Sequence, residues 1–208
     1  PRFDNNLLGF GLLLDAEGRT WVGTAGGVNV SENARHEPLE RVSWRHIRHR
    51  SDQSGGIPGD WVIRIRQNPS DGAIWMTHWP AVSSTEQYAL SVTRDAGQRF
   101  ETMLRGEKIN DIGFQGSVIF AAGNDLFISP DDGATWRKVS SIRSGTDRIS
   151  DRAVFYTVSA GADGVYIGSS EGLLHTGDGG LTWSIERTGF PLSGGNVYLP
   201  DAASVKGY

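Results

Sequence analysis

The chain has 208 residues, of which 24 are acidic and 20 basic, and its formal net charge is -4. This balance gives no electrostatic reason to bind nucleic acid or an acidic membrane surface, so we expect neither partner. The sequence contains no cysteine, which excludes disulfides, thiolate metal sites and cysteine nucleophiles. No stretch approaches the roughly 18 apolar residues of a membrane helix, so this segment should not insert directly into a membrane. The 28 glycines and seven tryptophans indicate many tight turns between short strands.

Four similar units follow one another along the chain. Each contains a turn rich in Asp or Gly, followed by a strand that begins at an apolar landmark. The landmarks are Trp21, Trp75, Ile119 and Tyr166. Asp-Gly turns between apolar runs favour β-hairpins, because glycine tolerates the positive φ that these turns need. The approximate units are 7–57, 58–108, 109–152 and 153–194, and 195–208 matches the start of a fifth.

A second turn recurs later in each unit, with the pattern Ser/Thr-x-Asp-x-Gly-x-Thr-Trp. It is clearest at 129–136 and 176–183, a weaker copy lies at 93–100, and Asn33 replaces the Asp in the first unit. Units of 40–50 residues with four short strands are typical of propeller blades. The sequence therefore predicts an all-β propeller of four-stranded antiparallel blades. About four blades are visible, and the unfinished fifth unit favours part of a larger propeller.

The recurring turn has a structural explanation. Its hydroxyl and carboxylate accept hydrogen bonds from the turn's own amides, its glycine adopts a conformation closed to other residues, and its aromatic packs beneath. We expect this structural role for Thr93, Asp95, Gly97, Phe100, Ser129, Asp131, Gly133, Trp136, Thr176, Asp178, Gly180 and Trp183. A calcium site at Asp131 and Asp132 is disfavoured, because adjacent carboxylates lack the further oxygen ligands of a calcium loop.

These octapeptides resemble Asp boxes, the bacterial-neuraminidase (BNR) repeats of sialidases, xyloglucan-cleaving glycosidases, sortilin-type receptors and photosystem II assembly factors. The stretches 14–24 and 56–62 are also similar to the periplasmic sensor propellers of two-component regulators. Together the resemblances cover nearly the whole chain. They imply a propeller and, because most such relatives act outside the cytoplasm, an extracytoplasmic location. They imply no single function, since Asp boxes occur in enzymes, receptors and scaffolds alike.

We expect function at the rim opposite the recurring turns, where loops line the usual binding mouth of a propeller. In the second unit the landmark Trp75 lies 20 residues before the box Asp, against 12 elsewhere, so eight extra residues fall within 78–87. His78, Trp79 and Glu86 are the candidate ligand-binding residues of this insertion. Trp79 would be an exposed stacking platform for a sugar or a peptide. Alternatively, Trp79 merely packs the longer loop.

The connection before this insertion carries the only dense basic run of the chain, at 44–50. Its candidate ligand-binding residues are Arg45, His46, Arg48, His49 and Arg50. Arginines, and histidines that titrate near neutral pH, would hold a carboxylate or a sulfate at the mouth. The alternative is an outer strand with its charges in water. A metal site is disfavoured because no third ligand accompanies the two histidines.

Enzyme signatures are missing from the sequence. It has no Gly-x-Ser-x-Gly elbow, no phosphate loop and no His-Glu-x-x-His motif, and we predict no catalytic residue. We therefore expect a non-catalytic binding or scaffolding module, without cofactor or metal, that recognises a carbohydrate or a protein surface. Two alternatives stay open: part of a sialidase- or glucanase-like hydrolase whose catalytic residues lie in further blades, and the periplasmic sensor propeller of a two-component regulator. Further blades or domains of the same polypeptide are also expected partners.

Overall fold

A computed structural model describes residues 5–188, and the predicted start of a fifth unit at 195–208 lies outside them. Four four-stranded antiparallel sheets make up most of this part of the chain. Its helical segments are short 3-10 turns, η1 (Asn5–Leu7) and η2 (Leu39–Arg41), and the described residues form no α-helix. The predicted all-β fold with four-stranded antiparallel blades is therefore confirmed.

Each sheet consists of strands that follow one another in the chain, and we call the sheets blades 1 to 4. Blade 1 contains β1 (Gly9–Leu14), β2 (Thr20–Thr24), β3 (Gly27–Ser31) and β4 (Arg45–Ile47). Blade 2 contains β5 (Trp61–Gln67), β6 (Ile74–Trp79), β7 (Ala89–Thr93) and β8 (Glu101–Met103). Blade 3 contains β9 (Ile109–Gln115), β10 (Val118–Gly123), β11 (Leu126–Ser129) and β12 (Arg137–Lys138). Blade 4 contains β15 (Phe155–Gly161), β16 (Gly164–Ser169), β17 (Gly172–Thr176) and β18 (Ser184–Glu186). A small hairpin of β13 (Arg143–Ser144) and β14 (Asp147–Arg148) projects from the connection between blades 3 and 4.

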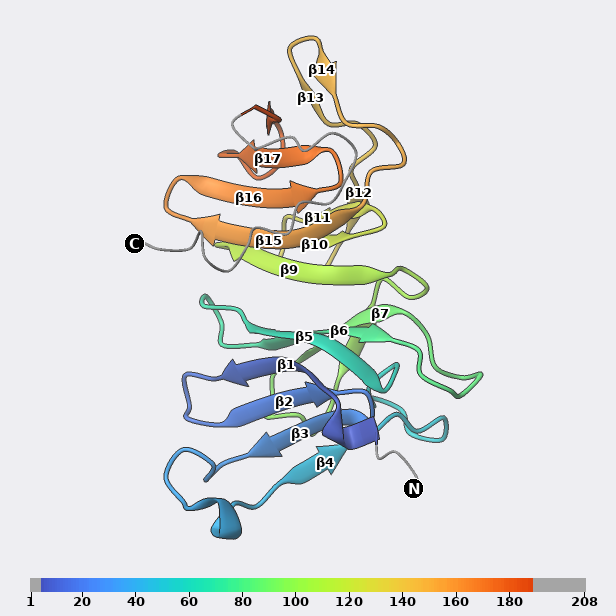
Figure 1. The fold of residues 1–208 in the computed structure, drawn as a ribbon, viewed down its shortest axis with the longest axis vertical. Coiled ribbons are helices and arrows are strands. Elements are labelled where there is room, and N and C mark those ends of the chain that lie inside the picture. Colours follow the sequence, from blue (N-terminus) through green and yellow to red (C-terminus); the bar gives the residue numbers. More distant parts are fainter. Residues whose placement is uncertain (1–4, 189–208) are drawn as a thin grey trace, which may run out of the picture.

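The blades are stacked face to face, with blade 1 at one end of the molecule and blade 4 at the other (Figure 1). The first strands of neighbouring blades contact one another. The core consists of three layers, and each layer contains buried side chains from two adjacent blades. Representative pairs are Trp21 with Ile65, Trp75 with Ile112, and Phe120 with Ile167. The stability of the fold therefore depends on contacts between blades, because no blade buries an apolar face by itself.

Strand register identifies the equivalent residues of the four blades. Ser31, Thr93, Ser129 and Thr176, the first residues of the recurring turns, pair with Thr20, Ile74, Ile119 and Val165. The residues that follow on the second strands are Trp21, Trp75, Phe120 and Tyr166. The prediction that Ile119 is the landmark of the third unit is thus wrong by one residue. The cause is the β10–β11 hairpin, which spans one residue fewer between the paired Ile119 and Ser129 than the equivalent hairpins of blades 1 and 4 do.

The recurring turns lie between the third and fourth strands, and we call those at 93–100, 129–136 and 176–183 the box turns. In blade 3, the Ser129 hydroxyl donates to Asp131 Oδ1 at 2.8 Å and accepts from the Gly133 amide at 2.8 Å. Asp131 Oδ1 also accepts from the Thr135 amide at 2.8 Å. The same bonds join Thr93, Asp95 and Gly97 in blade 2 and Thr176, Asp178 and Gly180 in blade 4. Hydroxyl and carboxylate thus satisfy amides that strand pairing leaves free.

Different turns and connections lie at the two ends of the blades. One end, the box rim, holds the box turns together with the turns between first and second strands. The other end, the mouth rim, holds the turns between second and third strands and the connections between blades. The extra residues of blade 2 form a loop at 80–88 between β6 and β7, so the insertion lies on the mouth rim.

A buried hydrogen bond on the box rim of blade 1 has no counterpart in blade 2. Asp15 Oδ2 accepts from the Trp21 indole at 2.7 Å and from Arg19 Nε at 2.6 Å. Burial raises the pKa of Asp15, but these hydrogen bonds outweigh burial and hold the pKa below its usual value. Asn68 occupies the equivalent turn position of blade 2, and its Nδ2 and the Trp75 indole nitrogen are both buried without a partner. An amide thus replaces a carboxylate that would accept from the indole.

Candidate functional site

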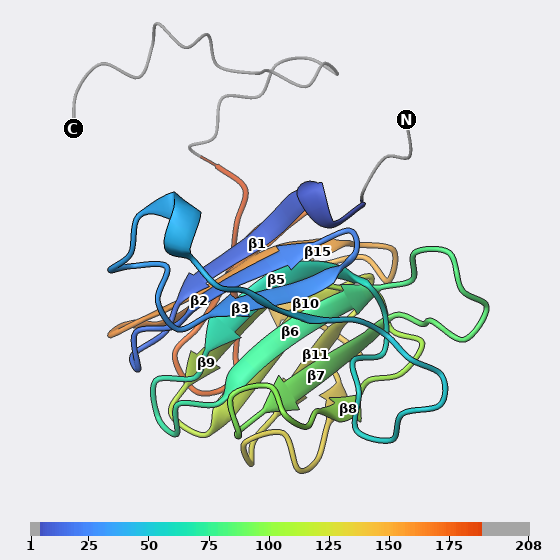
Figure 2. The same cartoon turned by 90° about the horizontal axis from the view of Figure 1, so that it is seen from below.

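Two segments of the mouth rim meet beside blades 1 and 2. The connection at 48–60 and the loop at 80–88 project on the same side of the molecule (Figure 2). His49 joins them, because its Nδ1 lies 2.8 Å from the Ile57 carbonyl and its Nε2 lies 2.9 Å from the Thr85 hydroxyl. The Gln87 amide also donates to the Pro58 carbonyl at 3.1 Å. The inserted loop is therefore fastened to the connection that carries the basic run.

A pocket of about 570 Å³ opens between these segments, and we call it the mouth pocket. Its walls come from 48–52, Asp60 and 81–86, with Asn5 and 25–26 at one side. This volume lies within the usual range for small-molecule sites, roughly 300–1,000 Å³. The lining is mostly polar and charged, which suits a ligand that carries hydroxyl, carbonyl or acidic groups.

Glu86 organises the inserted loop from within. Its Oε2 accepts from the amides of Asp60 and Ala81 at 2.9 and 2.8 Å. Its Oε1 accepts from the amides of Ser83 and Val82 at 3.0 and 3.4 Å. Burial raises the pKa of Glu86, but the four amide donors more than offset this and lower it overall. Glu86 is therefore an ionised carboxylate whose hydrogen bonds shape the pocket wall.

The cationic side of the pocket is exposed. The guanidinium of Arg48 lies 3.6 Å from the carboxylate of Asp60, and that of Arg50 lies 3.5 Å from the carboxylate of Asp52. The side chains of Arg48 and Arg50 are 63% and 66% exposed, whereas Asp60 is buried and accepts from the His49 amide at 2.6 Å. Both arginines thus retain donors that are open to a ligand.

The basic run divides between two environments. Arg45 and His46 belong to the outer strand β4, as the alternative interpretation has it. Arg45 donates to the carbonyls of Ala96 and Gly97 in the box turn of blade 2, and His46 Nε2 lies 2.8 Å from the Gly26 carbonyl. Arg48, His49 and Arg50 follow the strand and line the mouth pocket. Three of the five basic candidates are thus brought together, and two are engaged elsewhere.

His78 and Trp79 lie outside the mouth pocket. His78 is fully buried, with Nδ1 2.8 Å from the Gly59 carbonyl and Nε2 2.7 Å from the Ser91 hydroxyl. Burial lowers its pKa to about 4, so it is neutral at physiological pH. Trp79 is half-buried and donates to the Ile109 carbonyl at 3.1 Å, while the Lys108 ammonium lies 4.2 Å from its ring centre. We therefore omit both residues from the candidate site.

Asp60 and Thr85 are pocket residues that do not belong to the ligand-binding set expected from the sequence. Asp60 immediately precedes β5, and Thr85 lies within the insertion. The unusual length of the insertion is the one sequence signal that points toward Thr85. The position of Asp60 before a strand does not indicate that its carboxylate turns back toward the preceding connection.

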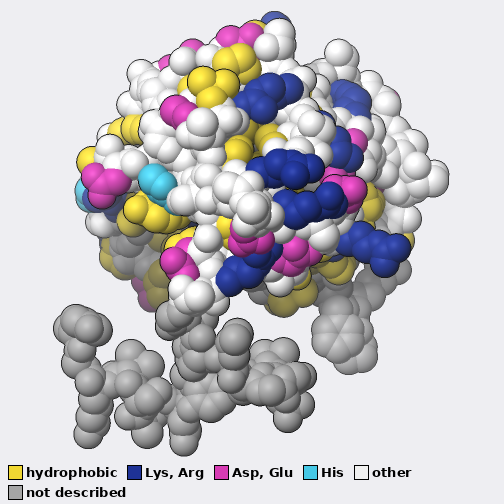
Figure 3. All heavy atoms as spheres, turned by 90° about the horizontal axis from the view of Figure 1, so that it is seen from above, with side chains coloured by type: hydrophobic (Ala, Val, Ile, Leu, Met, Phe, Trp, Pro, Cys, Tyr) yellow, Lys and Arg dark blue, Asp and Glu magenta, His cyan; other side chains and the backbone are white. Residues whose placement is uncertain are grey.

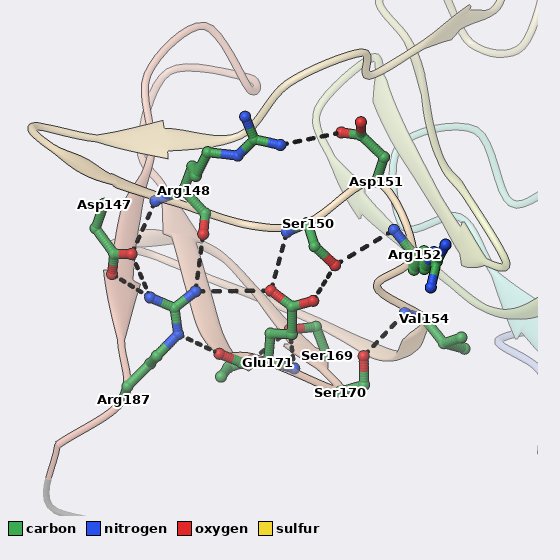
Figure 4. A network of polar contacts seen from close by, with 11 residues as sticks. Asp147, Arg148, Ser150, Asp151, Arg152, Val154, Ser169, Ser170, Glu171 and Arg187 are labelled. Carbon is green, nitrogen blue, oxygen red and sulfur yellow. Dashed lines mark hydrogen bonds and ion pairs between the residues drawn. The ribbon is translucent and has the colours of Figure 1, made fainter.

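The mouth rim beside blade 4 is held together by a polar network (Figure 4). Arg187 forms an ion pair with Asp147 and donates from Nε to the Glu171 carbonyl at 2.7 Å. Ser150 donates from its hydroxyl and its amide to the Glu171 carboxylate, and these hydrogen bonds lower the Glu171 pKa. The network fastens the projecting hairpin to blade 4. The charged groups of this network form ion pairs and hydrogen bonds with one another. The arginines of the mouth pocket are more exposed.

Within residues 5–188, no group of three His, Asp or Glu side chains is placed to hold a metal ion. No helix in the same range is long and apolar enough to cross a membrane.

Solved structures with similar folds are numerous, whereas no protein-family model and no curated protein matches the chain. An ancestral GH74 enzyme aligns over 86% of this chain and 24% of its own, at 18% identity and a TM-score of 0.59. The extracellular domain of a protein from B. thetaiotaomicron, BT3049, described as a hybrid two component system, aligns over 89% and 25%, at 15% identity and a TM-score of 0.61. Virginiamycin B lyase from Staphylococcus aureus aligns over 91% and 58%, at 12% identity and a TM-score of 0.60.

The chain spans about a quarter of the length of the first two of these proteins. At such low identity a structural likeness establishes the fold and leaves the chemistry to be argued from the site. The four antiparallel sheets and these likenesses together identify the fold of the chain as that of a β-propeller.

Proposed function

We propose that the chain is a non-catalytic binding module whose ligand, a carbohydrate or the surface of a protein, enters the mouth pocket. The observation that carries this proposal is the inserted loop at 80–88, which is fastened by His49 to the basic connection and encloses about 570 Å³ with it. Binding residues are commonly found on loops that a rigid scaffold positions. The exposed guanidinium groups of Arg48 and Arg50 would donate to hydroxyl, carbonyl or carboxylate oxygens of the ligand.

Two of the three carboxylates that line the pocket, Glu86 and Asp60, favour binding over hydrolysis. A glycosidase needs a general acid with a raised pKa and a second carboxylate across the sugar. The pKa of Glu86 is lowered instead, and its oxygens already accept four amide hydrogen bonds. Asp60 is buried and accepts from the His49 amide. Both groups are better suited to hold the shape of the pocket.

We also propose that the box turns are Asp boxes and that the chain functions outside the cytoplasm. The spacing of Ser or Thr, Asp and Gly, together with the hydrogen bonds of these turns, supports the first assignment. The second is supported by the structural likeness to an extracellular domain. It is independent of the mouth pocket.

The binding proposal is tested with the double variant Arg48→Ala, Arg50→Ala. Titration calorimetry would use xyloglucan oligosaccharides and sialyllactose as probes, after a glycan array has surveyed other sugars. We expect binding by the unmodified chain and a loss of at least about tenfold in affinity in the double variant, or 1.4 kcal/mol. Arg143→Ala is the matched control, because Arg143 is exposed on the hairpin and outside the pocket. It should bind as the unmodified chain does.

Three results would contradict parts of this proposal. Equal affinity of the double variant and the unmodified chain would contradict the assignment of the mouth pocket as the binding site. Release of sialic acid or of reducing ends from the probes would contradict the non-catalytic assignment. Binding to none of the arrayed glycans would exclude the carbohydrate arm and leave a protein surface as the ligand.

A further inference from the structure

The glycine of each box turn packs against the blade that precedes it. A Cβ on Gly97 would lie 3.2 Å from the ring of Trp21, and a Cβ on Gly133 would lie 2.5 Å from the ring of Trp75. In blade 4 a Cβ on Gly180 would lie 2.4 Å from Ile128. Real Cβ atoms essentially never approach below 3.0 Å, so at least two of these glycines are required by a neighbouring blade as well as by their own positive φ.

A second contact accompanies the glycine in two of the three interfaces. Arg45 on the outer strand of blade 1 donates to the carbonyls of Ala96 and Gly97 in blade 2. Arg137 has the same register on the outer strand of blade 3 and donates to the Gly180 carbonyl at 3.1 Å. The face that a blade presents to its successor is therefore specialised to receive a box turn.

Blade 4 presents such a face with no described residue from a following blade upon it. Tyr166, the equivalent of Trp21 and Trp75, is 38% exposed, whereas both tryptophans are fully buried. Its ring centre lies 4.5 Å from that of His175, and Leu173 beside them is half-buried. Figure 3 views this end of the molecule and shows hydrophobic and histidine side chains exposed near a row of basic ones. We call Tyr166, Gly168, Leu173 and His175 the Tyr166 face.

Gly168 lies two residues after Tyr166 on the second strand of blade 4. By register it is equivalent to Gly23 of blade 1. A Cβ on Gly23 would lie 2.4 Å from the Val62 carbonyl, because the first strand of blade 2 passes there. A Cβ on Gly168 would lie 2.8 Å from the side chain of Thr157, so blade 4 itself already requires this glycine. The Tyr166 face thus repeats one feature of the occupied faces, an aromatic ring on the second strand, whereas its glycine is shared with blade 1 alone, because blades 2 and 3 have Thr77 and Ala122 at that position.

We propose that the Tyr166 face is a docking surface for a further four-stranded blade, one that presents a box glycine to the ring of Tyr166. The three occupied interfaces argue for this partner, because each is completed by the box turn of the following blade. The partner is a blade of the polypeptide to which this sequence belongs.

Blade 1 of a second copy is a poorer fit to the Tyr166 face for two reasons. Blade 1 has Arg35 where the other blades have the box glycine, four residues after Ser31. Its open face also carries η1, whose Asn6 side chain exchanges hydrogen bonds with Asn29 at 3.2 and 2.8 Å. An arginine in place of a glycine would meet the ring of Tyr166 in such a pairing.

The test measures thiol labelling in the full polypeptide as its source produces it. The segment from 1 to 208 has no cysteine, so a single introduced thiol can be followed by peptide mass mapping. Leu173→Cys probes the Tyr166 face while keeping the ring, and Tyr166→Cys repeats the measurement at the ring itself. Leu39→Cys is the exposed control, since Leu39 is 88% exposed, and Ala122→Cys is the buried control.

We expect Leu173→Cys to react at least about tenfold more slowly than Leu39→Cys in a monomeric polypeptide, as a site that reacts only after opening would. Fast labelling of both Leu173→Cys and Tyr166→Cys in that polypeptide would overturn the proposal. Slow labelling that becomes fast on dilution, together with the mass of a dimer by light scattering, would show that a second copy covers the Tyr166 face. That result would also overturn the proposal.

Discussion

The box rim and the mouth rim belong to the same four blades but follow different rules. On the box rim, three turns repeat the same hydrogen bonds and each packs its glycine on the preceding blade. On the mouth rim, the second-to-third connection ranges from a short turn at 25–26 to the loop at 80–88. A turn that must fit a neighbour tolerates little change, whereas a loop directed into solvent can lengthen. The turns of the box rim thus share one structure, whereas the loops of the mouth rim differ in length.

The largest effect should come from filling the contact between a box glycine and the preceding ring. We expect Gly133→Ala to lower the free energy of unfolding by about 3 kcal/mol, because the new methyl group meets Trp75 and the residue has a φ of 92°. Gly116→Ala is the control, since Gly116 also has positive φ but has open space around it, and it should lose about 1 kcal/mol. Urea unfolding measures both. Equal losses would show that the glycine serves its turn alone.

The mouth end of blade 2 should be the acid-sensitive part of the molecule. Burial lowers the pKa of His78 from 6.5 to about 4, so between these values the unfolded chain binds more protons than the folded chain. Stability therefore falls as the pH drops through this window, by about 2.5 kcal/mol at pH 4.5 relative to pH 7. His78→Gln should be less stable at pH 7 yet lose correspondingly less between pH 7 and 4.5. Parallel stability curves for the two proteins would contradict this assignment.

Replacing the buried carboxylate of blade 1 by the amide found in blade 2 should lower the free energy of unfolding slightly less than the preceding changes do. Asp15→Asn removes the ion pair with Arg19 and sets an amide where the Trp21 indole needs an acceptor, as Asn68 does in blade 2. We expect a loss of about 2 kcal/mol from the buried unpaired donor. Glu17→Gln also removes a charge beside Arg19, but Glu17 is half exposed, and its loss should stay within about 0.5 kcal/mol. Thermal unfolding that does not distinguish these variants would show that the buried acceptor is dispensable.

The smallest effect on stability should come from the mouth pocket itself. Arg50→Ala removes an exposed side chain whose partner Asp52 is also exposed, so we expect a change within about 0.5 kcal/mol by urea unfolding. This variant distinguishes the roles of the two rims. Substitution of a box glycine should destabilise the fold, whereas substitution of Arg50 should lower ligand affinity and leave stability unchanged. A destabilisation above 1 kcal/mol would mean that Arg50 has a structural role.

The repeated parts of the fold can be predicted because their signals are local. A Ser or Thr, an Asp and a Gly at fixed spacing form a turn through their own hydrogen bonds, so box turns such as 129–136 are visible in the sequence. The register of the third unit is not visible in the same way. A single-residue shortening of the β10–β11 hairpin leaves a plausible gapless alignment, and the difference between Ile119 and Phe120 emerges only from strand pairing.

The candidate site is partly predictable for a related reason. Extra length at 78–87 and a dense basic run mark the region where the mouth pocket lies. They do not determine which side chains face the pocket. Tertiary contacts bury His78, attach Arg45 to a neighbouring box turn and leave Arg48 and Arg50 exposed. Those outcomes depend on residues far away in sequence, such as Ser91 and Gly97.

The packing of two box glycines on the ring of the preceding blade, Gly97 on Trp21 and Gly133 on Trp75, gives the assembly a direction. During synthesis the ring of Trp21 emerges first and stays bare until Gly97 has been translated, and Trp75 then waits for Gly133 in its turn. Chains fold from the N-terminus as they emerge from the ribosome, so each new blade is a cap for the one before and a template for the one after. A ribosome that stalls after blade 1 or after blade 2 would therefore leave Trp21 or Trp75 uncapped, and the exposed ring would identify the last blade completed.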